Sequence, residues 1–82
     1  MYYVYLLESL TEEKSYYLGS TNDLRRRFDE HNSGNGCQTT KGKKWKLIYY
    51  EAYQTLELAR ERERKLKNHR CSKRALYNRL GI

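Results

Sequence analysis

Three segments of the chain show the pattern of β-strands. Residues 2–8 carry aromatic and branched side chains on both faces, which is typical of a strand covered on both sides. Residues 15–20 form a second such segment, and the polar residues 9–14 between the two predict an antiparallel hairpin with a loop longer than a tight turn. Residues 45–53 form the third strand. The pattern predicts three strands but does not fix their order in the sheet.

Three further segments begin with a polar capping residue and continue as a helical pattern, and their caps are Thr21 or Asn22, Thr55, and Ser72. The first helix ends at Gly34, the second runs to about Asn68, and the third ends before Gly81. The element order is therefore ββαβαα. It predicts an α+β fold in which helices flank a small three-stranded antiparallel sheet.

Helical spacing separates the arginines of the first helix. One stripe of this helix combines two apolar and two polar side chains at i, i+3, i+4 and i+7, namely Leu24, Arg27, Phe28 and His31. Arg25 and Arg26 lie off that stripe. Arg27 either faces a pocket or lays its stem along apolar surface with its charge in water.

Glu63 is the corresponding polar residue of the second helix. At about 100° per residue it falls between Leu56 and Ala59, with Leu66 on the same side. A carboxylate on a buried stripe costs several kcal/mol unless it is paired, hydrogen-bonded or bound to metal. Two interpretations follow: an internal salt bridge between Glu63 and Arg27, or a pocket that both residues line.

Two of the nine tyrosines stand out by position. Tyr5 and Tyr17 lie on the two strands of the hairpin, which can bring their hydroxyls together. Gly19 follows Tyr17 by two residues and leaves space on the same face for a ligand or another backbone. Most other tyrosines are expected to be strand packing, in particular Tyr2, Tyr16, Tyr49, Tyr50 and Tyr53.

Size and charge narrow the function classes. A chain of 82 residues is expected to form one domain, 1–82. Its formal net charge is +7, and the positive charge concentrates beyond the first 21 residues. Such a basic excess favours a polyanionic partner, and nucleic acid is the first candidate; the alternative is that the charge only keeps the surface soluble.

The apolar start at residues 1–7 is too short to span a membrane and has the pattern of a strand. We therefore expect a cytoplasmic protein without a membrane partner.

Taken together, these motifs resemble the GIY-YIG nuclease superfamily over about residues 2–68. The resemblance is carried by Tyr3-Val4-Tyr5, by Tyr17-Leu18-Gly19 and the following residues 20–34, and by residues 49–52 and 59–67. It is strongest to the small stand-alone bacterial branch, the UPF0213-like proteins. The resemblance implies a metal-dependent endonuclease that hydrolyses nucleic-acid phosphodiester bonds in DNA repair or processing, with DNA favoured over RNA.

Residue by residue, the resemblance implies Glu63 as ligand of one divalent ion, Mg²⁺ or Mn²⁺, and Arg27 as the group facing the scissile phosphate. It places Tyr5 and Tyr17 at the nucleophile, without saying which one activates water, and gives His31 a supporting role. These residue types suit the chemistry, because a metal ion and a guanidinium both stabilise charge on phosphoryl oxygens. Further basic residues are expected to contact nucleic acid: Arg25, Arg26, Lys41, Lys43 and Lys44.

The chain departs from the family pattern at Tyr3, where the first signature has glycine. If that position needs glycine's backbone freedom, activity is lost; if it is an ordinary strand residue, nothing is lost. Asn78 is a weak match for an asparagine that some families place late in the domain. We also expect no separate targeting domain, and we expect a partner protein to perform that task. The rival interpretations are a non-catalytic basic module that binds nucleic acid on the same fold, and a protein-interaction domain with a structural salt bridge.

Overall fold

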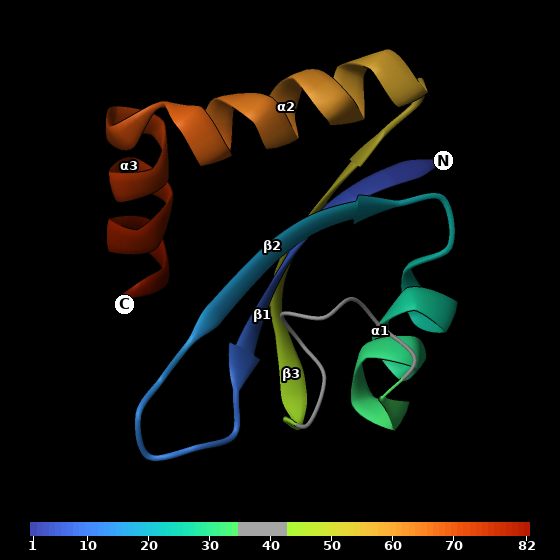
Figure 1. The fold of residues 1–82 in the computed structure, drawn as a ribbon. Coiled ribbons are helices and arrows are strands. Elements are labelled where there is room, and N and C mark those ends of the chain that lie inside the picture. The colour runs from blue at the N-terminus through green and yellow to red at the C-terminus, as the bar shows by residue number, and fades with distance from the viewer. Residues whose placement is uncertain (35–42) are drawn as a thin grey trace.

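The computed structural model describes residues 1–34 and 43–82 (Figure 1). Its elements follow the order ββαβαα, and their bounds are β1 Tyr2–Ser9, β2 Tyr16–Thr21, α1 Leu24–Ser33, β3 Trp45–Tyr53, α2 Leu56–Asn68 and α3 Arg70–Leu80. The predicted α+β class and element order are confirmed.

The three strands form one antiparallel sheet in the order β2-β1-β3. Strand β1 is central, so Tyr5 lies opposite Gly19 on one side and opposite Tyr50 on the other. The pairing of β1 with β3 shifts register between Leu6 and Leu7. Strand β2 pairs with β1 alone, which makes it an edge of the sheet.

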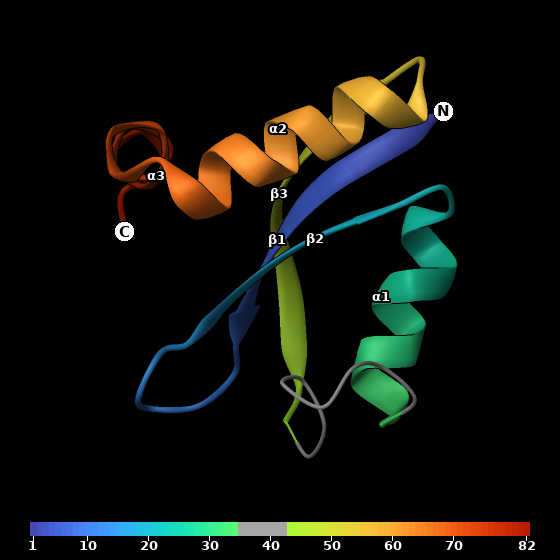
Figure 2. The ribbon, with the colours of Figure 1, turned by 45° about the horizontal axis from the view of Figure 1, so that its top comes forward.

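Side chains of β1 alternate between two cores, one on each face of the sheet. Val4 packs with residues of α2 and α3, in a cluster with Ala59, Leu66 and Leu76. Tyr5 and Leu7 point the other way and pack with Trp45, against partly buried residues of α1. Figure 2 shows α1 on one side of the strands and α2 with α3 on the other. Burial on both faces explains why the first strand is apolar throughout.

The turn from β2 into α1 differs from the prediction. Asp23 is the N-cap, and its side chain accepts a hydrogen bond from the backbone N–H of Arg26. Thr21 ends β2 instead, and its hydroxyl bonds both backbone groups of Asp23, so it shapes the turn before the helix. The predicted stop is confirmed, because Gly34 follows α1 with a left-handed φ of 85° that favours glycine.

Thr55 caps α2 as predicted, by accepting a hydrogen bond from the Leu58 backbone N–H. The predicted cap of the last helix is wrong. One extended residue, His69, separates α2 from α3, so Ser72 lies within the first turn of α3. This short connection lets Leu76 reach the core that it shares with the end of α2.

Within residues 1–34 and 43–82, none of the helices is both long enough and apolar enough to span a membrane.

Candidate active site

A buried hydrogen bond between β1 and α1 forms the centre of the site. The Tyr5 hydroxyl lies 2.8 Å from His31 Nε2, and both side chains are almost fully buried. Strand alternation turns Tyr5 toward α1, and the helical stripe turns His31 toward the sheet. The inward orientation predicted for His31 is therefore what the structure has.

Gly19 makes room for this arrangement. A Cβ atom built at Gly19 would lie 2.6 Å from the Tyr5 hydroxyl oxygen and 3.0 Å from Cε2 of Tyr17. Any side chain there would displace the Tyr5 ring. The expected space beside Gly19 is thus occupied by Tyr5, and not by a ligand or a second backbone.

Tyr17 joins this cluster from the neighbouring strand. Its ring centroid lies 5.0 Å from that of His31 and 6.3 Å from that of Tyr5. Tyr17 is half-buried, whereas Tyr5 is 1% exposed. Of the two tyrosines, Tyr17 is the one that a molecule outside the protein can reach.

Arg27 lies one helical turn before His31. Its Nη1 donates to the carboxylate of Glu30 at 3.1 Å, and this contact is the main cause that raises the Arg27 pKa. Burial acts against it, and a hydrogen bond with Tyr5 adds to the increase in pKa. A guanidinium only donates, so Arg27 donates to the Tyr5 oxygen.

His31 is neutral in this arrangement. Burial lowers the His31 pKa, the positive charge of Arg27 lowers it further, and Glu30 opposes both. A neutral imidazole carries its proton on one ring nitrogen, so the tautomer of His31 sets whether Nε2 donates to the Tyr5 hydroxyl or accepts from it. Tyr5 thus links Arg27 to His31 through two hydrogen bonds at its hydroxyl.

Glu63 lies on the opposite face of the sheet. The Ser20 hydroxyl donates to Glu63 Oε1 at 2.9 Å, and Lys67 Nζ lies 3.5 Å from Oε2. Ser20 directly follows Gly19 on β2, so its side chain points away from Tyr5 and toward α2. Glu63 and Arg27 each have an ionic partner on their own helix, and the salt bridge between them that the sequence allowed is not formed.

The structure thus brings four of the five predicted site residues together on the α1 face: Tyr5, Tyr17, Arg27 and His31. Glu63 borders the same edge strand, β2, from the α2 face. The sequence analysis did not predict a role for Ser20. Its position could have indicated one, because the residue after Gly19 on the same strand must face the other helix layer.

The oxygen ligand that Glu63 offers suits Mg²⁺. Among residues 1–34 and 43–82 no group of three histidine, cysteine or acidic side chains gathers to hold a metal. Mg²⁺ commonly binds through one or two carboxylates, with waters and substrate phosphates completing its shell. Glu63 fits that pattern, because its carboxylate is 20% exposed and its ionic partner Lys67 is 50% exposed and can move away.

Basic side chains surround the α1 face. Arg25 and Arg26 are exposed on α1, as their position off the stripe predicted. Lys44 Nζ donates to the backbone oxygen of Asn32 at 2.8 Å, and Lys43 Nζ lies 5.9 Å from the centroid of the Trp45 ring. The predicted contact residue Lys41 lies outside the described residues.

Tyr3 is an ordinary strand residue. It pairs with Thr21 and Ala52 in the sheet, and no described residue other than glycine has a positive φ. The backbone at Tyr3 therefore does not require glycine.

The packing role predicted for Tyr50 is wrong, because 54% of its surface is exposed.

Asn78 is exposed on α3, where it lines a shallow pocket with basic residues of the same helix.

The ordered signatures and this geometry agree with one family model, the GIY-YIG catalytic domain, which matches residues 1–78. The chain belongs to the GIY-YIG family. A UPF0213 protein of Haloquadratum walsbyi is 35% identical over 74 residues, which are 89% of this chain and 81% of that protein. A UPF0213 protein of Halobacterium salinarum is 35% identical over 79 residues, covering 94% of this chain and 100% of the relative.

A UPF0213 protein of Streptococcus pneumoniae is 42% identical over 66 residues, which are 79% of this chain and 65% of the relative. The GIY-YIG relatives therefore include archaeal as well as bacterial proteins, and the expected bacterial branch was too narrow. Membership places the chain in a nuclease superfamily whose members generally depend on a divalent metal and act on nucleic acid. The names of the relatives state no activity. No solved structure matches this chain significantly.

Proposed function

We propose that this GIY-YIG protein is an endonuclease that hydrolyses phosphodiester bonds of DNA with one divalent ion. The single observation that carries the proposal is the hydrogen-bonded link from Arg27 through Tyr5 to His31. It fixes a guanidinium beside Tyr5, whose ring neighbours that of Tyr17. Charge on a phosphoryl group in transit is best stabilised by such fixed donors.

Arg27 is the residue that faces the scissile phosphate in this proposal. Its side chain is 29% exposed, so part of the guanidinium remains open to a ligand while Glu30 and Tyr5 hold its position. Arginine presents a rigid fork of donors that matches phosphate oxygens. Arg25 and Arg26 contact the nucleic-acid backbone only as exposed charges.

The two tyrosines take different roles. Tyr17 is half-buried and borders the cluster, so we assign it to the attacking water, which it orients through its hydroxyl. Tyr5 is buried and bonded to His31, so it positions Arg27 and Tyr17 and does not touch the substrate.

Glu63 is the residue that would hold Mg²⁺ or Mn²⁺, with Ser20 orienting its carboxylate. When bound, such an ion neutralises phosphate charge and stabilises the leaving oxygen. Because β2 is an edge strand, a nucleic-acid backbone lying along that edge meets the Arg27 face and the Glu63 face together. The net charge of +7 favours this approach, and a partner protein would then select the target site.

The proposal is tested by single-turnover cleavage of branched and nicked DNA in Mn²⁺, with matched arginine variants. Arg27→Ala is expected to slow cleavage about 10²-fold or more with little loss of DNA binding, because its donors act on charge that develops in the transition state. Arg25→Ala and Arg26→Ala are the controls, and each is expected to weaken binding slightly and to flatten its salt dependence.

Equal rate losses for all three variants would contradict the role of Arg27. If the wild-type protein cleaves no substrate but still binds DNA, the chain is instead a non-catalytic binding module on the GIY-YIG fold. Circular dichroism of each variant checks that the fold is kept.

A further inference from the structure

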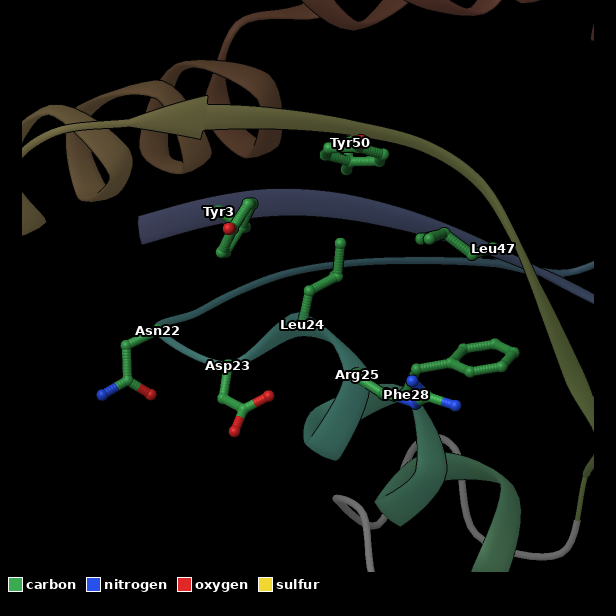
Figure 3. Close-up of a pocket in the computed structure, with 8 residues that line it drawn as sticks. All are labelled: Tyr3, Asn22, Asp23, Leu24, Arg25, Phe28, Leu47 and Tyr50. Atoms are coloured by element: carbon green, nitrogen blue, oxygen red, sulfur yellow. The ribbon is translucent and has the colours of Figure 1, made fainter. Parts of the chain in front are cut away.

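A pocket of about 560 Å³ lies beside the catalytic cluster, between the start of α1 and the strands β1 and β3 (Figure 3). Its walls are apolar and aromatic, and they come from Tyr3, Leu24, Phe28, Leu47 and Tyr50. Polar side chains of Asn22, Asp23 and Arg25 stand at its rim. The volume lies in the range of about 300–1,000 Å³ that holds small ligands. None of the proposed catalytic residues lines this pocket.

Tyr50 is the unusual wall residue. It stands in the middle of β3, yet 54% of its surface is exposed. Its ring meets that of Tyr3 edge to face, with centroids 6.1 Å apart and planes at 65°. A flat ring can therefore lie on one tyrosine face and against the edge of the other. Together with the other walls of the pocket, Tyr50 forms a contiguous apolar surface, and such surfaces mark binding sites.

The register of the sheet places this pocket next to the site. Tyr5 lies between Gly19 and Tyr50 across the strands, so the catalytic cluster is on one side of Tyr5 and the pocket on the other. On α1, Arg27 and His31 serve the cluster, whereas Leu24 and Phe28 serve the pocket. A nucleic-acid chain with its backbone at Arg27 thus has the pocket within reach of a neighbouring nucleotide.

We propose that this pocket binds one unpaired nucleobase next to the scissile phosphate, so that the substrate is single-stranded at that point. This inference rests on the proposed nuclease function. Every base presents a flat π-face, and stacking on aromatic side chains contributes about 1–3 kcal/mol per base. The exposed guanidinium of Arg25 at the rim suits the phosphate of the same nucleotide.

The rim also limits how the base is read. The Asp23 carboxylate is already used as the cap of α1, where it accepts from the Arg26 backbone at 3.1 Å. Asn22 is exposed, and its Oδ1 accepts one long hydrogen bond from the Arg26 side chain at 3.5 Å, so its amide can turn toward a base edge. One adaptable amide and two stacking walls give little sequence preference. A base inside a duplex is stacked on its neighbours and cannot enter unless it is flipped out.

The experiment measures binding without divalent ions, so that cleavage does not interfere. The probes are a fluorescein-labelled single-stranded DNA 12-mer, its duplex, and the same single strand with abasic sites. Tyr50→Ala is expected to weaken single-strand binding about 5-fold to 150-fold, which is the stacking energy converted to affinity. Duplex and abasic binding should change little, because both rest on phosphate contacts.

Two matched variants serve as controls. Tyr50→Phe keeps the ring and should retain single-strand affinity. Leu58→Ala removes a side chain that is 53% exposed on α2, outside the pocket, and should leave all three probes unaffected. A 2-aminopurine base in the single strand gives an independent readout on the wild-type protein, since stacking on tyrosine should quench its fluorescence.

The pocket assignment is overturned if Tyr50→Ala binds the single strand as tightly as wild type, if it weakens duplex binding equally, or if 2-aminopurine is not quenched. These outcomes are separate from the nuclease test. If cleavage depends on Arg27 but Tyr50→Ala has no effect on binding, only the pocket proposal is contradicted. If binding depends on Tyr50 but the protein does not cleave, only the nuclease proposal is contradicted.

Discussion

Two carboxylates lie on the α2 side of the sheet, Glu51 on β3 and Glu63 on α2, and their surroundings differ. Glu51 on β3 receives three hydrogen bonds from Arg62, at 2.9, 3.1 and 3.3 Å, and one each from Tyr49 and Tyr53. Burial alone raises the Glu51 pKa, but these donors outweigh burial and lower it. Burial and the hydrogen bond to Glu51 raise the pKa of Tyr53 to about 12, while the charge of Arg62 opposes the increase.

Glu63 has one serine donor and one exposed lysine at 3.5 Å. Both carboxylates belong to the α2 side of the sheet, yet only Glu51 has its oxygens filled by fixed partners. Glu63 keeps capacity for an ion. The comparison shows that a half-buried carboxylate in this small domain is structural where the fold surrounds it with donors, and available where the fold leaves it at an edge.

The largest expected effect tests this difference directly. Glu63→Gln keeps the shape and removes the charge, so cleavage is expected to fall at least about 10²-fold and divalent-ion binding to be lost, while the melting temperature stays near wild type. Isothermal titration with Mn²⁺ and single-turnover cleavage are the measurements. A variant that melts early yet binds Mn²⁺ as wild type does would make Glu63 structural.

Glu51→Gln is the matched change, and it should do the opposite. It leaves the Arg62 charge without its partner, which costs about 3–5 kcal/mol for a fully buried pair. Arg62 is 31% exposed, so a loss of about 2 kcal/mol in unfolding free energy is expected here. Urea denaturation measures it. Unchanged stability would mean that the donors around Glu51 contribute little to the fold.

A second pair of variants separates the tyrosines on the α1 face. Tyr17→Phe is expected to slow cleavage about 10-fold to 100-fold with stability unchanged, since its hydroxyl acts on the attacking water. Tyr5→Phe leaves His31 Nε2 buried without its hydrogen-bond partner and should cost about 1–3 kcal/mol of stability. Cleavage rates and urea denaturation of both variants are compared. A purely kinetic effect of Tyr5→Phe would reverse the two assignments.

Gly19→Ala tests the close approach beneath Tyr5. The added methyl group would lie 2.6 Å from the Tyr5 hydroxyl, and such overpacking typically costs about 1–3 kcal/mol. Thermal unfolding measures the loss. Combining Gly19→Ala with Tyr5→Phe removes the nearest atom and should make the two changes non-additive, with partial recovery. Simple additivity would show that the strand moves as a whole instead.

The smallest expected effect is a pH dependence of stability. The pKa of His31 is lowered by folding, so the unfolded chain binds the proton more tightly. Stability from this residue is complete above the ordinary histidine pKa of about 6.5 and is lost as pH falls below it, with a slope of at most about 1.4 kcal/mol per pH unit. Urea denaturation between pH 7.5 and 5.5 should show the loss.

His31→Gln should flatten this pH dependence, whereas His69→Gln at an exposed position should keep it. A dependence that survives His31→Gln would assign the titration to another group.

The local pattern along the chain determined the element order, most element ends and the inward orientation of Arg27 and His31. These features depend on interactions within a few residues: the strand alternation of residues 2–8, the glycine that ends α1, and the stripe of Leu24 and Phe28. Two predicted helix caps were wrong, although Thr21 and Ser72 are residue types that cap helices well. Thr21 instead shapes the turn before α1 through its hydrogen bond with Asp23, and Ser72 lies within the first turn of α3.

Only the tertiary structure decided which polar groups meet. The order β2-β1-β3 places Tyr5 between Gly19 and Tyr50, and this order creates both the catalytic cluster and the pocket beside it. The same topology separates Arg27 from Glu63. Each is a polar residue on an otherwise apolar helical stripe, but the two lie on opposite faces of the sheet. Pairing across strands depends on contacts between residues far apart in the chain, and periodicity carries no information about them.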